Sequence, residues 1–424
     1  MKNNINKILK QEIELIKLDK DTLKNIESVS NNFCKELKNK LKKKKIKADV
    51  FIGGSLAKNT LIKRRDSKYD IDIFVRFDAK YGEDKDISSI LGKVLEGWAE
   101  KIHGSRDYYQ IVINGITIEI IPVLKIKKPS EAKNVTDLSY FHVNYVLKKI
   151  RMNRKIADEI KLTKAFGHAH DCYGAESYIK GFSGYAIELL ICHYKNFLKL
   201  AKEIAKQKSE EQIIIDDAKF YKNKKEVLME MNESKIHSPI ILIDPTFKER
   251  NALAGLSTET YKRFKKACED FLKKPVLETF DRKGVYGGFK GKKDLIIISV
   301  KTNKQKGDIA GTKSKKFSNF FVSQLRREFL IKKSGFDYDD EKNIAYFYLI
   351  LDKKQKEIIK GPPVQRVEHL TAFKKVHANA FIKNDYAWAE VSHDISFENW
   401  LKRFLEKDKD IIKGMSVKEI KIIK

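Results

Sequence analysis

Two acidic residues, Asp70 and Asp72, stand one residue apart in an otherwise apolar segment, 69–77. Because side chains alternate across a β-strand, both carboxylates would point to the same side. Carboxylate oxygens on one face suit Mg²⁺, which fills its remaining positions with water and substrate phosphates. Glu119, in the apolar segment 116–124, would supply a third carboxylate from a neighbouring strand. These residues predict a two-metal site, in which one ion activates an attacking hydroxyl and the other stabilises a leaving group.

A glycine-rich turn before this strand has the composition of a phosphate-binding site. Gly53 and Gly54 follow the apolar run ADVFI, and glycine lets the backbone come close to a bulky ligand. Ser55 stands at the expected N-cap of a short helix, where its hydroxyl and the free amides would face an anion. Lys58 and Asn59, one turn later, would reach the same phosphates. Neither GGS nor DxD is specific when it occurs alone. The alternative to a metal site is that Asp70, Asp72 and Glu119 lie on the solvated faces of amphipathic strands. Their succession within one small α/β unit favours a catalytic site.

The elements that must position these residues follow from the hydrophobic pattern. Residues 1–48 have helical spacing and end in the basic run LKKKKIK. The pattern predicts strands over 48–54, 69–77, 108–113 and 116–124, and a helix over 87–102. Pro129 and the polar residues after it mark the end of this unit.

The rest of the chain divides into a helical region and a mixed region. Residues 139–272 are predicted to be helical, with interruptions near 213–217 and 238–245. The pattern then predicts a strand over 295–302, a helix over 317–333, a strand over 343–352 and a short helix after Pro362 and Pro363. We expect an α+β or α/β multi-domain protein with a head (1–128), a helical neck (129–275), a body (276–355) and a tail (356–424).

The charge balance favours a polyanionic partner. The 424 residues include 87 Lys and Arg against 58 Asp and Glu, a formal net charge of +29. This excess attracts RNA, DNA or an anionic membrane, although a lysine-rich proteome would give the same balance. No apolar run is long enough to span a membrane, and the N-terminus has no signal-peptide pattern. The four cysteines, Cys34, Cys172, Cys192 and Cys268, form no CxxC pair. We expect reduced, mostly buried thiols in a soluble cytoplasmic protein.

Several segments together resemble one enzyme family. The segment from Gly53 to Phe74, GGSLAKNTLIKRRDSKYDIDIF, is similar to the core of the polymerase β-like nucleotidyltransferases. KAFGHAHDCYGAESYIKGFSGYAIELLICHY (164–194) resembles a signature of the archaeal-type, class I CCA-adding tRNA nucleotidyltransferases. IDPTFKERNALAGLS (243–257), GPPVQRVEHLTAFKKVH (361–377) and YAWAEV (386–391) resemble further parts of that family. The resemblance therefore covers nearly the whole chain.

The resemblance implies an activity and a set of partners. It implies stepwise addition of C, C and A from CTP and ATP to the tRNA 3′ end, with Mg²⁺ and with release of pyrophosphate. Head and neck would bind the nucleotide, while body and tail would hold the acceptor stem and TΨC arm of tRNA. A membrane partner is not expected, and a homodimer is one alternative for the oligomeric state. The competing functions are a poly(A) or oligoadenylate-type polymerase and a non-catalytic RNA-binding protein on the same fold.

The family's site residues carry over to particular positions here. Gly54, Ser55 and Lys58 match phosphate-holding positions, His142, Lys164 and Tyr173 match other nucleotide contacts, and Arg250 matches an arginine that reads the incoming base. Each of the last four residues also has a purely structural interpretation. His142 would be a histidine at a helix start and Lys164 a solvated lysine. Tyr173 would be a core aromatic residue, and Arg250 would form an interdomain ion pair. Two positions depart from the family. Glu119 replaces the usual Asp, and Lys58 replaces the more typical Arg, so a point charge would replace a bidentate grip.

Three other patterns are interpreted as structural. His168, His170 and Cys172 alternate in HAHDC, but helical spacing would splay them and no fourth ligand is apparent. GDIAGTKS (307–314) lacks the second glycine directly before the lysine of a P-loop, so a flexible basic loop is expected. KGVYGGFKG (283–291) has aromatic residues out of register for an RNA-binding strand, and we expect a turn-rich connector.

Overall fold

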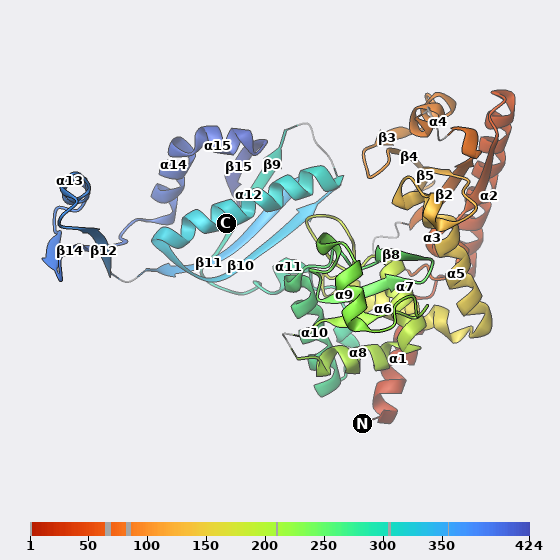
Figure 1. Cartoon of the computed structure of the whole chain (residues 1–424), viewed down its shortest axis with the longest axis horizontal. Helices are drawn as coiled ribbons and strands as arrows, with labels where there is room; N and C mark the ends of the chain where they lie inside the picture. Colours follow the sequence, from red (N-terminus) through yellow and green to blue (C-terminus); the bar gives the residue numbers. More distant parts are fainter. Residues whose placement is uncertain (1, 64–68, 82–85, 209–210, 304–306, 355) are drawn as a thin grey trace. The chain divides into compact units, whose positions relative to one another are not determined.

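The protein is described by a computed structural model that covers residues 2–63, 69–81, 86–208, 211–303, 307–354 and 356–424 (Figure 1). The chain forms two compact units. The first unit comprises Met1–Ala175 and Ile179–Arg282, and the second comprises Glu176–Tyr178 and Lys283–Lys424. Residues 64–68, which belong to the glycine-to-aspartate motif, lie outside the described residues.

A five-stranded sheet in the first unit has the order β1-β2-β5-β4-β3. Its strands are β1 (Ala48–Ile52), β2 (Tyr69–Phe77), β3 (Glu100–Ile102), β4 (Tyr108–Ile113) and β5 (Ile116–Leu124). β2 and β5 are parallel, and the other neighbours are antiparallel. The predicted strands over 69–77, 108–113 and 116–124 are confirmed. The helix predicted over 87–102 was too long, because α4 (Ile87–Leu95) ends before Gly97, whose φ of +73° turns the chain into β3.

Alternation along β2 separates a core face from a polar face. Ile71, Ile73, Val75 and Phe77 are fully buried against α2 (Lys20–Lys43) and α4. Both helices begin at an aspartate cap: Asp19 accepts a hydrogen bond from an amide of α2, and Asp86 does the same for α4. Asp70, Asp72, Phe74 and Arg76 therefore occupy the opposite face of the sheet. The hydrophobic core thus fixes which face carries the carboxylates.

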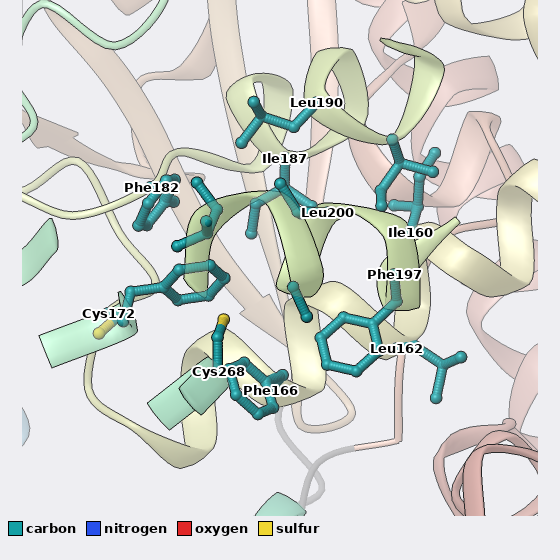
Figure 2. Packing of buried hydrophobic residues seen from close by; sticks show 14 of the residues in the cluster. Ile160, Leu162, Phe166, Cys172, Phe182, Ile187, Leu190, Phe197, Leu200 and Cys268 are labelled. Carbon is teal, nitrogen blue, oxygen red and sulfur yellow. The ribbon is translucent and has the colours of Figure 1, made fainter. Parts of the chain in front are cut away.

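The helical part of the first unit packs around phenylalanines. Its helices are α1 (Lys2–Ile16), α5 (Ser139–Met152), α6 (Lys155–Ala169), α7 (Gly184–Tyr194), α8 (Phe197–Lys206), α9 (Lys224–Glu230) and α10 (Thr258–Lys273). A small sheet contains β6 (Ile213–Ile215), β7 (Ile240–Asp244) and β8 (Phe247–Asn251). Phe166 is fully buried beside Phe197 (Figure 2). The Phe166 ring centroid lies 5.0 Å from that of Phe197 and 5.5 Å from that of Phe264. Ile5, Ile8 and Leu9 of α1 join this core, although the expected head begins at residue 1.

The second unit contains two further sheets. The larger has the order β10-β11-β9-β15, and the smaller has the order β12-β14-β13. The strands are β9 (Leu295–Thr302), β10 (Phe329–Asp339), β11 (Ile344–Lys353), β12 (Glu357–Pro363), β13 (Phe381–Lys383), β14 (Tyr386–Val391) and β15 (Val417–Ile422). The helices are α11 (Gly284–Gly287), α12 (Gly307–Glu328), α13 (Val367–Val376), α14 (Phe397–Lys407) and α15 (Lys409–Gly414). β15, from the predicted tail, thus pairs with β9 of the predicted body.

Helix α12 corrects two predictions about the second unit. Residues 307–314, expected to be a flexible loop, form its first two turns. Ala310, Ser314, Phe317 and Phe321 are buried along one side, which is the spacing of an amphipathic helix. The helix ends at Glu328, so residues 329–333 begin β10 instead of continuing the predicted helix. The strands predicted over 295–302 and 343–352 match β9 and, within one residue, β11.

Several short elements complete the fold. The single-turn helix α3 (Gly54–Ala57) follows β1, and 3₁₀ turns form at Ala79–Tyr81, Pro129–Glu131, Val135–Leu138, Glu233–Lys235 and Leu277–Phe280. Within the described ranges, no helix combines the length and the apolar character needed to cross a membrane. All four cysteines are free and buried, as the sequence predicted.

Candidate active site

A cavity of about 370 Å³ lies in the first unit, between the polar face of β2 and helices α5, α6 and α7. Eight of the ten predicted site residues line it: Gly54, Ser55, Lys58, Asp70, Asp72, His142, Lys164 and Tyr173. The other two, Glu119 and Arg250, are not among its lining residues. These eight residues come from five parts of the chain, so the fold brings together groups that are up to 119 positions apart in the sequence.

The turn after β1 is shaped by two side chains of β2. A Cβ atom on Gly53 would overlap the ring of Phe74, and one on Gly54 would overlap the carboxylate of Asp72. Gly54 also has a φ of +56°, a conformation that favours glycine. The residue before the helix is Gly53, so Ser55 lies inside the single turn of α3 and is not its N-cap. The short helix predicted to continue beyond Ser55 is wrong in its length, because α3 ends at Ala57. The close approach of Gly53 is to Phe74, and that of Gly54 is to Asp72.

The three predicted carboxylates share one face of the sheet. Asp70 pairs with Thr117 and Asp72 with Glu119 in the parallel register of β2 and β5. Glu119 accepts a long hydrogen bond of 3.4 Å from Gln110 of β4. Burial raises the pKa of Asp72, against the opposing effect of the nearby Lys58 ammonium. Within the described ranges, no three His, Cys, Asp or Glu side chains are grouped closely enough to hold a metal ion.

A buried charged network forms another part of the cavity wall. The Lys58 ammonium lies 2.6 Å from a carboxylate oxygen of Glu188, and Lys164 lies 3.6 Å from the other oxygen. Lys164 also donates hydrogen bonds to the hydroxyl and carbonyl oxygens of Thr60, at 3.1 and 3.3 Å. Burial lowers the pKa of Lys164 to about 8, although Glu188 opposes the shift. The structure does not bear out a solvated Lys164, because its side chain is only 5% exposed.

A second polar cluster stands beside the cavity around Asp244. This carboxylate lies 2.9 Å from Nε2 of His142 and 2.8 Å from Nη1 of Arg250, and it accepts a hydrogen bond of 3.0 Å from the Tyr185 hydroxyl. Burial alone would raise the pKa of Asp244, but His142 and Arg250 hold it well below its ordinary range. Burial lowers the pKa of His142. Arg250 is therefore held by an ion pair with Asp244, and its side chain remains 23% exposed.

Tyr173 reaches the cavity from a loop that glycines shape. Gly174 has a φ of +119°, and a Cβ atom on Gly184 would lie 3.0 Å from the Tyr173 hydroxyl oxygen. His168 stacks on Tyr173 with ring centroids 4.1 Å apart and also lines the cavity. His170 packs against Phe166 instead, with ring centroids 4.6 Å apart. HAHDC accordingly forms no metal site among the described residues.

Sequence reasoning missed three residues that organise this site. Glu188 and Tyr185 lie within the block GFSGYAIELL, and Asp244 lies within IDPTFKERN, two segments in which the family resemblance assigns these residues no role. The available signal was an acidic residue among apolar helix or strand residues, because such a residue is seldom buried without a partner. Glu188 and its partner Lys58 are 130 positions apart in the sequence, so their pairing could not be inferred from residue spacing.

Comparisons with known proteins identify the family of this chain. Residues 158–281 match the family described as tRNA nucleotidyltransferase, second domain, and residues 3–139 match the Second Messenger Oligonucleotide or Dinucleotide Synthetase domain. The CCA-adding enzyme of Nanoarchaeum equitans is 36% identical over 343 residues, which are 80% of this chain and 82% of that protein. That of Methanocaldococcus jannaschii is 28% identical over 97% of this chain and 91% of that protein.

Solved structures show the same fold at low sequence identity. A cytoplasmic RNA terminal U-transferase is 12% identical and covers 66% of this chain and 99% of its own, with a TM-score of 0.51. The Cid1 poly(U) polymerase bound to MgATP is 13% identical and covers 65% of this chain and 98% of its own, with the same score. The family match and the curated relatives show that this chain is a nucleotidyltransferase. More particularly, the chain belongs to the family of the archaeal CCA-adding enzymes.

Proposed function

We propose that this protein completes the 3′ end of tRNA by adding C, C and A from CTP and ATP, with release of pyrophosphate. The observation that carries this proposal is the cavity itself, which is lined both by the paired carboxylates of β2 and by the buried lysines Lys58 and Lys164. An acidic wall suits cations and an attacking hydroxyl, while a basic wall suits a triphosphate. We infer the acceptor, tRNA, and the nucleotides, CTP and ATP, from membership in the CCA-adding family.

Asp70 and Asp72 would hold Mg²⁺, with Glu119 next to Asp72 as a third carboxylate. The donor set fits this ion, because oxygen ligands on one face leave positions for water and phosphate. When bound, Mg²⁺ would supply charge stabilisation at the attacking and leaving oxygens. The raised pKa of Asp72 supports this role, since a bound cation stabilises the charge of a half-buried carboxylate that lies beside another carboxylate.

The basic wall would hold the triphosphate. Lys58 and Lys164 would each place an ammonium group against phosphate oxygens, and Ser55 and the backbone at Gly54 would bind from the turn. Tyr173 would add a hydroxyl donor. These contacts are to groups that CTP and ATP share, so they would not distinguish the two nucleotides.

Base recognition would fall to the cluster around Asp244. His142 stacks on Tyr185 with ring centroids 4.0 Å apart, and both rings line the cavity. Arg250 lies over the Tyr185 ring at 5.5 Å and is fixed by Asp244. We propose that Arg250 reads the base edge from this position, because its planar donors can satisfy base acceptors.

The second unit would hold the acceptor stem and TΨC arm of tRNA. A cavity of about 480 Å³ between β12 and α13 is lined in part by Arg366, His369 and His377. Beside it, the Lys360 ammonium lies 3.3 Å from the centre of the Tyr386 ring. Cationic and aromatic groups of this kind bind RNA phosphates and unstacked bases. The proposed setting is the cytoplasm, where tRNA is found.

The test uses a tRNA transcript that ends just before CCA. With CTP alone we expect two added nucleotides, with ATP alone none, and with both the complete CCA end. Sequencing gel analysis of the product separates the alternatives. A long adenylate tail would indicate a poly(A)-type polymerase, and products formed without tRNA would favour an oligonucleotide synthetase, to which residues 3–139 are also similar. If no product forms, the remaining alternative is a non-catalytic RNA-binding protein.

A further inference from the structure

Glu188 lies between the two lysines of the cavity wall, although each of the three residues comes from a different segment. Glu188 is on α7, Lys164 is on α6, and Lys58 directly follows α3. One carboxylate oxygen lies 2.6 Å from Lys58 Nζ, and the other lies 3.6 Å from Lys164 Nζ. Their side chains are 1%, 7% and 5% exposed, for Glu188, Lys58 and Lys164. The carboxylate therefore bridges the head segment and the helical core at the ligand-facing wall.

The burial of these groups requires the carboxylate. Two neighbouring ammonium groups lose hydration and repel each other when they are buried, and a carboxylate between them offsets both costs. Thr60 fixes the second lysine further, since its hydroxyl and carbonyl oxygens both accept hydrogen bonds from Lys164. Both ammonium groups consequently have defined positions before a nucleotide arrives. Groups held in place in advance lose less conformational entropy when they bind a ligand.

We propose that Glu188 is a positioning residue for the triphosphate, which acts by holding the ammonium groups of Lys58 and Lys164 at the cavity wall. This inference rests on the proposed function, because it assigns a role within nucleotide binding. Glu188 acts through the lysines and not on the reacting atoms. Its effect must therefore be the same for CTP and ATP, and it must appear mainly in KM.

The first test is Glu188→Gln, which keeps the shape of the side chain and removes its charge. At saturating tRNA, KM should rise about tenfold for CTP and by a similar factor for ATP, while kcat changes less than about threefold. The wild-type protein is assayed alongside. Lack of CCA addition by the wild type would contradict the proposed function, whereas normal KM values in a folded Glu188→Gln variant would overturn only the role of Glu188.

A double-mutant cycle separates positioning from structural support. In a Lys58→Met background, Glu188→Gln should raise KM by a much smaller factor than in the wild type, because one of its two targets is absent. An unchanged factor would overturn the inference. The control is Glu159→Gln, which neutralises a partly buried carboxylate that does not line the cavity. This carboxylate accepts a hydrogen bond of 2.8 Å from the backbone amide of Phe197. This variant should lower thermal stability and leave KM unchanged.

A conservative variant covers the case in which Glu188→Gln does not fold. Glu188→Asp retains the charge but withdraws the carboxylate by one methylene, so the short contact to Lys58 is lost. Here KM for both nucleotides should rise about threefold, with a melting temperature close to that of the wild type. Unchanged KM values in Glu188→Asp would mean that the positions of the ammonium groups do not matter, and would overturn the proposal.

Discussion

Buried charge is the main property of the individual side chains in the active site. Lys58, Lys164 and Glu188 are nearly inaccessible to solvent, and they line the same cavity as Asp72. Such groups are costly to bury unless each has a partner of opposite charge. The pKa of Lys164 is lowered to about 8 mainly by burial, which places its titration within a range that kinetics can reach.

The protonation of Lys164 predicts a pH dependence. Lysine is cationic below its pKa and neutral above it, so the free enzyme loses a phosphate-binding charge as pH rises through about 8. For both CTP and ATP, kcat/KM should fall by about tenfold per pH unit beyond that point. The measurement is a profile between pH 6.5 and 9.5. Lys164→Met should have low kcat/KM throughout and lack this limb. A flat wild-type profile would contradict the role of Lys164.

Removal of Arg250 should change nucleotide choice more than overall affinity. Arg250→Ala should admit UTP or unbalance CTP against ATP, because a base-edge hydrogen bond is lost. Such a bond is worth about 1–3 kcal/mol, or roughly tenfold to a hundredfold in discrimination. The readout is kcat/KM for CTP, ATP and UTP on tRNA ending before each addition site. Equal losses for all three would assign Arg250 to structural support of Asp244, the ion pair that the structure shows.

Among the elements, the turn between β1 and β2 controls the position of Asp72. Gly54→Ala would add a Cβ against that carboxylate at a φ of +56°. We expect activity to fall by about a hundredfold, because displaced catalytic groups lose their alignment. Gly115→Ala is the matched control, since Gly115 has a φ of +78° but open space around its Cβ position. Both variants should lose about 1–2 kcal/mol of stability from backbone strain. Equal activity in both would contradict the positional role of the turn.

The strands were easier to predict than the helix boundaries. β2 and β5 were predicted with their observed bounds, because alternating β-branched residues around Asp72 and Glu119 leave little freedom of register. The start of α12 was missed because Ala310, Gly311 and Ser314 are small residues that carry little hydrophobic signal. They are buried through tertiary packing, and Gly311 lies directly against the ring of Tyr178. Eight of the ten predicted site residues line the cavity, but their buried acidic partners depend on contacts between distant segments.

For the whole molecule, the net charge of +29 predicts strongly salt-dependent binding of tRNA. Each RNA phosphate neutralised by Lys or Arg releases counterions, so log Kd should change linearly with log[salt]. For a footprint of several phosphates, affinity should fall by about 10³-fold or more between 50 and 200 mM salt. Filter binding or fluorescence anisotropy would measure the slope, with a tRNA-sized polyanion such as heparin as competitor. A flat plot would mean that the excess lysines do not contact RNA.

The central claim is that the carboxylates of β2 drive metal-dependent nucleotidyl transfer on tRNA, and single substitutions test it most directly. Asp70→Ala and Asp72→Ala should each lower the incorporation of both C and A by at least about 10³-fold. Binding of tRNA should stay nearly intact, because these side chains face the small cavity. The measurement is single-turnover pyrophosphate release at saturating Mg²⁺, alongside tRNA affinity. A near wild-type rate in either variant would contradict the assignment of the active site.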